Sequence, residues 1–142
     1  MAKQLNIFLE NKPGRLAAVT QVLHDRHVNI RAVTIQDRGD FGLMKLLVDK
    51  PEEAKLAFTE RGFACALKDV LAVRIPDEPG GLHKLAAVFL EHGINVVDGY
   101  GFVVESRKAA VWCFEADTID RIKGILSKAG FEILEDPELY SL

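Results

Sequence analysis

Apolar residues recur at alternate positions in several short segments, and this pattern predicts β-strands. In the first, Leu5, Ile7 and Leu9 alternate with Asn6, Phe8 and Glu10, which is the period of a strand with one buried face. Three more strands are predicted in the first half of the chain, at 29–35, 43–48 and 63–67. Arg38, Gly39 and Asp40 supply the turn residues of a hairpin between the second and third strands.

Between these strands the apolar spacing changes to three and four residues, which predicts amphipathic helices. One helix is expected to begin at Pro13-Gly14, because proline suits a first helical turn. A second is expected to begin at Pro51 and to end at Gly62, a common residue just past a helix end. Their apolar stripes are Leu16, Val19, Val22 and Leu23 in the first helix, and Ala54, Ala57 and Phe58 in the second.

The second half of the chain repeats the first. The turn from Asn11 to Leu16 recurs as Asp77 to Leu82, at an offset of 66 residues, and such internal repeats decide the architecture of a fold. Strands are predicted at 71–75, 95–103, 109–114 and 131–134, with helices at 82–89 and 119–129. The chain is therefore expected to form two domains, 1–68 and 69–142, each with the order β-α-β-β-α-β.

This order predicts an α+β fold of two ferredoxin-like βαββαβ plaits, because right-handed crossovers place both helices on one face of an antiparallel sheet. Domains of this size bury a modest share of their surface, so the two plaits are expected to pack side by side. The segment 67–70 lacks the length and composition of a flexible tether. Since this fold hosts many functions, the function must be inferred from sites.

Charge and composition narrow the function classes. A net charge of −3 and a pI near 5.8 disfavour a nucleic-acid binder, which normally carries a basic surface. No long apolar segment is found, so neither a signal peptide nor a membrane span is expected, and the cytoplasm is the expected location. Cys65 and Cys113 lie in apolar strand-like runs outside any metal motif, which suits buried reduced thiols. His24 and His27 lack further ligands, so no metal or cofactor is expected.

The duplicated turn resembles the ACT domain, a small regulatory module that binds amino acids. The resemblance is carried by Asn-x-Pro-Gly-x-Leu at 11–16 with Val28-Asn29-Ile30, and by 77–82 with Ile94-Asn95-Val96; in both halves 18 residues separate the turn from the strand asparagine. It implies a tandem ACT protein that is not an enzyme, similar to free-standing regulators that bind an amino acid and act on a metabolic enzyme.

The physics of the turn agrees with this use. The amides of Gly14, Arg15 and Leu16 at a helix N-terminus can hold an α-carboxylate. The side chain of Asn11 offers both a donor and an acceptor to a zwitterion. The alternative is that Asn11 only caps the helix or makes a turn.

The resemblance also implies that ligands bind between one module's turn and the other module's second strand. The first site would combine Asn11, Gly14, Arg15 and Leu16 with Asn95 and Val96. The second would combine Asp77, Gly80, Gly81 and Leu82 with Asn29 and Ile30. Since Asp77 repels a carboxylate, the first site is expected to bind more tightly.

Two other functions stay open from the sequence. An RNA-binding plait would need exposed aromatic residues on its central strands, where only Phe8 is found. A small enzyme would use the carboxylates of Glu10, Asp77 and Glu78, whose pKa values would have to differ.

Two further features of the sequence, a glycine-rich stretch and an apolar sheet face, allow predictions. The stretch from Gly99 to Phe102 is expected to line the ligand cleft or to form a bulge, and Trp112 is expected in the core. An apolar sheet face that includes Phe8, Val33 and Leu47 is expected to be covered in a homodimer.

Overall fold

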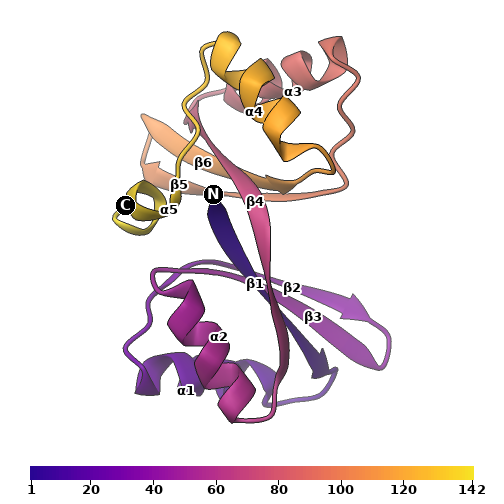
Figure 1. Ribbon diagram of the computed structural model, residues 1–142, viewed down its shortest axis with the longest axis vertical. Helices are drawn as coiled ribbons and strands as arrows, with labels where there is room; N and C mark the ends of the chain where they lie inside the picture. The colour runs from indigo at the N-terminus through magenta and orange to yellow at the C-terminus, as the bar shows by residue number, and fades with distance from the viewer. The chain divides into compact units, whose positions relative to one another are not determined.

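The computed structural model describes residues 1–142 and divides into two compact units. The N-terminal module contains Lys3–Lys68 and Ser141, and the C-terminal module contains Met1–Ala2, Asp69–Tyr140 and Leu142. In each module two helices lie together on one face of a sheet (Figure 1). No helix has both the length and the apolar content that a membrane crossing requires.

The N-terminal module confirms the predicted element order. Its elements are β1 (Ala2–Glu10), α1 (Arg15–Asp25), β2 (Ile30–Arg38), β3 (Phe41–Val48), α2 (Pro51–Glu60) and the first part of β4 (Ala64–Pro76). The strand order is β2-β3-β1-β4, as in a ferredoxin-like plait. The core lies between sheet and helices and is built from the predicted apolar stripes, including Leu5, Ile7, Val19, Val22 and Phe58.

The C-terminal module repeats this arrangement. The second part of β4 is followed by α3 (Gly81–Glu91), β5 (Asp98–Glu105), β6 (Ala109–Glu115), α4 (Ile119–Lys128) and the short α5 (Asp136–Tyr140). The strand order is β4-β6-β5. The segment 132–134 hydrogen-bonds to the second part of β4, where the amide of Leu134 donates to the carbonyl of Ala72 at 2.8 Å.

Several predicted boundaries were wrong. Helix α1 begins at Arg15 rather than at Pro13-Gly14, because Gly14 occupies the N-cap with a left-handed φ of 90°. The strands predicted at 63–67 and 71–75 are one continuous strand, β4. The predicted strand 131–134 is reduced to a single bridge between Val73 and Ile133. Strand β5 begins at Asp98, so Asn95 and Val96 precede it.

The apolar sheet face expected from Phe8, Val33 and Leu47 does not exist as predicted. Val33 pairs directly with Leu46, which belongs to the core beneath the helices, and directly paired residues share a face. Val33 therefore lies on the helix side, whereas Phe8 pairs with Leu43 on the other. Leu47 is fully buried.

The glycines of β5 make room for an aromatic ring. A β-carbon at Gly99 would lie 2.7 Å from Cζ2 of Trp112, and one at Gly101 would lie 3.1 Å from its Cε3. Trp112 is half-buried against the C-terminal core, as predicted. The irregularity of β5 lies between Val103 and Glu105, so the bulge predicted at the glycines is wrong.

Candidate ligand site

The turn between β1 and α1 leaves the start of the helix without a side-chain cap. Gly14 is the N-cap residue, and no side chain caps the amides of the first turn of α1. The turn before α3 has the same geometry, with Gly80 at the N-cap at a φ of 85°. Since the first amides of a helix have no intrahelical partner, both turns present the positive end of a helix dipole, although the amide of Gly81 donates to the carbonyl of Glu78 at 3.0 Å.

Asn11 ties this turn to the β2–β3 hairpin and does not cap the helix. Its side-chain amide donates to Oδ1 of Asp37 and to the carbonyl of Gly39, both at 2.9 Å, and its backbone amide donates to the carbonyl of Asp40 at 2.9 Å. Of the two structural alternatives, the turn is confirmed and the helix cap is wrong. Both side-chain donors are used, so Oδ1 is the group that Asn11 offers to a ligand.

Asp77 holds the matching turn of the C-terminal module. Its Oδ2 accepts a hydrogen bond from the backbone amide of Arg107 at 2.6 Å, and its own amide donates to the carbonyl of Lys108 at 3.3 Å. Arg107 has a left-handed φ of 64°. Asn11 and Asp77 therefore each hold the turn of their own module against a hairpin. The side chain of Asn11 does so as a donor, and that of Asp77 as an acceptor.

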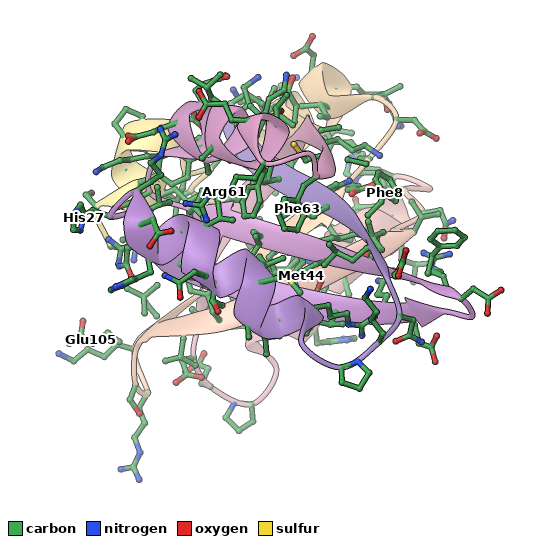
Figure 2. All side chains as sticks on the ribbon, turned by 90° about the horizontal axis from the view of Figure 1, so that it is seen from below. Phe8, His27, Met44, Arg61, Phe63 and Glu105 are labelled. Atoms are coloured by element: carbon green, nitrogen blue, oxygen red, sulfur yellow. The ribbon has the colours of Figure 1, made fainter.

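A cavity of about 540 Å³ opens beside the β1–α1 turn of the N-terminal module. Its walls are mostly apolar, and its charged groups are Glu10, Lys12 and Arg15. Glu10 and Lys12 form an ion pair at 2.9 Å on the surface. Phe8 of β1 and Phe63, the residue before β4, both line the cavity; both are labelled in Figure 2. The lining residues are Phe8, Leu9, Glu10, Lys12, Pro13, Gly14, Arg15, Ala18, Phe41, Gly62, Phe63 and Ala64.

Arg15 is the cation of this cavity that lacks a partner. Its Nη1 atom is buried without a hydrogen bond. The guanidinium lies over Gly42 of β3, where a β-carbon would come within 2.0 Å of Nη1. A buried donor without a partner costs folding free energy. An anion bound at Arg15 would supply the missing hydrogen-bond acceptor.

The remaining predicted residues lie elsewhere in their own modules. Leu16 and Leu82 are in the first turns of α1 and α3, and their side chains are 46% and 42% exposed. Asn29 lies at the start of β2, where its amide donates to Oδ1 of Asp49 at 2.9 Å. Asn95 borders a separate cavity of about 330 Å³ before β5. The pairing of each turn with the asparagine of the other module stays a prediction.

The carboxylates proposed for an enzyme each have their own partner. Glu10 pairs with Lys12, and Glu78 pairs with Lys84 at 3.4 Å. Asp77 accepts from the backbone of Arg107. No contact joins any two of these three carboxylates, so the structure gives no acid–base pair for catalysis.

Sequence reasoning missed the aromatic part of the cavity. Phe41 is 62% exposed and begins β3 directly opposite Glu10. Phe8 is 52% exposed, and Phe63 packs edge-on against Phe58 with ring centres 5.4 Å apart. The available signal was the occurrence of Phe41 immediately after a turn, where a large apolar residue is unexpected.

A comparison with family models identifies the family of this chain. The model of a family described as an ACT domain pair matches residues 1–142. A bifunctional chorismate mutase/prephenate dehydratase from Aquifex aeolicus (strain VF5) is 32% identical over 113 residues, which make up 78% of this chain and 28% of that protein.

Two solved structures are similar. Protein BT0572 from Bacteroides thetaiotaomicron is 33% identical, with a TM-score of 0.92 over 99% of this chain and 96% of that one. The regulatory subunit of aspartate kinase from Thermus thermophilus, in its ligand-free form, is 19% identical, with a TM-score of 0.65 over 90% and 92%. The second likeness shows the fold alone.

Proposed function

Since the chain belongs to the ACT domain pair family, we propose that it is a non-catalytic regulatory protein that binds a free amino acid and modulates an enzyme of amino-acid metabolism. The curated relative is named for two activities, and the chain spans 28% of its length. The aspartate kinase neighbour is named as a regulatory subunit. These names support a regulatory role beside a catalytic partner.

The observation that carries the proposal is the cavity beside the β1–α1 turn with its unpaired Arg15. An α-carboxylate would bind to the guanidinium and to the free amides at the start of α1, because both favour negative charge. The ammonium group would bind to Oδ1 of Asn11 or to the carboxylate of Glu10. A zwitterionic amino acid would thus find donors for its carboxylate and an acceptor for its ammonium group beside the same turn.

We further propose that each turn is closed by the other module, as the ACT resemblance implies. The first site then adds Asn95 and Val96 to Asn11, Gly14, Arg15 and Leu16. The second adds Asn29 and Ile30 to Asp77, Gly80, Gly81 and Leu82. The first site is the tighter one, because Asp77 repels a carboxylate and the second turn has no arginine.

Regulation would follow from a population shift. A ligand that binds one arrangement of the protein better moves the population toward it, and the favoured arrangement contacts the partner enzyme. We propose that the protein acts in the cytoplasm as a homodimer, which light scattering after size exclusion tests.

A thermal-shift screen over the twenty amino acids tests the proposed function. A ligand at 100 times its dissociation constant should stabilise the protein by about 2.7 kcal/mol. Isothermal titration of each hit should then show tighter binding at the first site than at the second, or binding at the first site alone. If no amino acid raises the unfolding temperature at millimolar concentration, the proposal is wrong; two equal sites would contradict the assigned asymmetry.

A further inference from the structure

The cavity beside the β1–α1 turn has a counterpart in the C-terminal module, and the two differ in chemistry. Turn residues correspond at an offset of 66, and residues from β3 onward correspond at an offset of 68, because the pair Leu9–Gly42 matches the pair Ile75–Ala110. The counterpart measures about 380 Å³. It is lined by Arg74, Ile75, Pro76, Lys84, Lys108, Ala109, Gly130, Phe131 and Glu132.

Charged residues replace the apolar walls in the C-terminal module. Arg74 stands where the N-terminal module has Phe8, and Glu132 stands where it has Ala64. Nε of Arg74 and Oε2 of Glu132 form an ion pair at 2.9 Å. Ala109 stands at the position of Phe41, so the aromatic wall is missing as well.

The arginine at the start of the first helix is also specific to the N-terminal module. Arg15 lies over Gly42, and both positions are changed together in the other copy, to Gly81 and Ala110. A methyl group at position 42 would occupy the place of the guanidinium, since its β-carbon would lie 2.0 Å from Nη1. Glycine at 42 and arginine at 15 therefore act as one unit, which the C-terminal module lacks.

Two phenylalanines at the cavity are exposed to solvent. Phe8 and Phe41 are 52% and 62% exposed, although burial of such rings is strongly favoured. A ligand with a large apolar side chain would cover them. The volume of about 540 Å³ falls within the range of about 300–1,000 Å³ found for small-molecule sites.

From these observations we propose that the cavity of the N-terminal module selects amino acids with a large apolar side chain, aromatic ones foremost, and that its C-terminal counterpart does not bind them. This inference rests on the proposed amino-acid-binding function and names its ligand class. The α-carboxylate binds to Arg15 on the helix side of the sheet, where the side chain packs against Phe63. Phe8, Glu10 and Phe41 lie on the other face by their strand pairing, and they meet the ligand where the cavity passes the last residues of β1, with Glu10 binding the ammonium group.

Titration calorimetry of the full chain with L-phenylalanine, L-leucine, L-serine and L-aspartate tests the ligand class. L-Phenylalanine should bind tightest, with one equivalent per chain at this cavity, and serine and aspartate should bind weakly. 3-Phenylpropionate, which lacks the ammonium group, separates an amino-acid site from a site for any aryl carboxylate. Its dissociation constant should exceed that of L-phenylalanine by about tenfold or more, because it lacks one charge-assisted hydrogen bond.

Two substitutions locate the site. Gly42→Ala should weaken phenylalanine binding by about tenfold or more, because the methyl group displaces the guanidinium. The displaced atoms are the flexible guanidinium end of the half-buried Arg15 side chain and no backbone atom, so the fold should be retained. Phe41→Ser, at a mostly exposed ring, should reduce the preference for phenylalanine over serine. Gly124→Ala in α4, where a β-carbon meets no atom within 4 Å, is the control and should bind as the native chain does.

The outcomes separate the two proposals. If serine or aspartate binds and phenylalanine does not, the ligand class is wrong and the proposed function stands. If phenylalanine binds equally well to the native chain and to folded Gly42→Ala and Phe41→Ser, the cavity is not the site. If none of the twenty amino acids binds, the proposed function itself is wrong. Circular dichroism and thermal unfolding without ligand establish that each variant is folded.

Discussion

The packing of Trp112 over β5 allows a quantitative prediction of stability. Replacing Gly99 by alanine would place a β-carbon 2.7 Å from Cζ2 of Trp112 and 3.2 Å from the carbonyl oxygen of Cys113. Separations below 3.0 Å are not tolerated, so the indole ring must move away from the core that it covers. Gly99→Ala should therefore destabilise the C-terminal module.

The magnitude follows from two opposing effects. Forcing an extra methyl group into a packed site costs about 1–3 kcal/mol. Alanine in place of glycine also reduces the freedom of the unfolded chain, which returns about 0.4–1 kcal/mol. Because β5 is an edge strand that can give slightly, we expect a net loss of about 1–2 kcal/mol.

Urea unfolding followed by fluorescence is the direct assay, since Trp112 is the chain's single tryptophan. With a urea m-value of about 2 kcal/mol/M, in the middle of the usual range, the urea midpoint should fall by about 0.5–1 M. Gly124→Ala is the matched control, because it lies inside α4 with open space around it. It should stabilise the protein by about 0.5–1 kcal/mol.

A double-mutant cycle isolates the contact. In a Trp112→Leu background, followed by circular dichroism, Gly99→Ala should no longer be destabilising. If Gly99→Ala matches or exceeds the native midpoint while Gly124→Ala raises it, the glycines do not serve to seat the indole and this reasoning fails.

Three further predictions concern other parts of the chain. Gly81→Ala should lower the unfolding temperature, because its β-carbon would lie 2.1 Å from the backbone oxygen that ends β4; an unchanged melting curve would contradict this contact. Burial raises the pKa of Cys113 to about 12, so iodoacetamide at pH 8 should alkylate the half-buried Cys65 first. Equal labelling of both thiols in native protein, measured by mass spectrometry, would argue against that burial. The hydrogen bond from Arg61 lowers the pKa of Asp25 below its ordinary 3.8. Its stabilisation is therefore complete above that pH and is lost as the pH falls through the lowered pKa. Asp25→Asn should lose this contribution at neutral pH and show a shallower acid limb in stability-against-pH curves; an unaltered limb would refute the link.

The local pattern of apolar residues was sufficient to predict the helices and strands. The cavity could not be predicted in this way, because it depends on which strands pair. Periods of two and of three to four residues located the strands and helices, and the repeat identified the turn. The start of α1 was misplaced because the left-handed φ of Gly14 is set by the turn, whereas Pro13 alone suits a helix. The role of Gly42 was invisible because it depends on its pairing with Leu9, 33 positions away, and on the path of the Arg15 side chain. Continuity of β4 was missed since Lys68 and Asp69 interrupt its apolar pattern.

The exchange of Arg15 and Gly42 for Gly81 and Ala110 restricts how the two copies diverged after duplication. A chain with both the arginine and the alanine would have its guanidinium displaced, whereas a chain with glycine at both positions has no guanidinium to displace. The residues at these two positions are therefore coupled, and each copy carries a compatible pair. Restoring arginine at position 81 is obstructed today, because any β-carbon there meets the backbone of Pro76. The second copy therefore cannot carry an arginine at this position without a shift of its backbone.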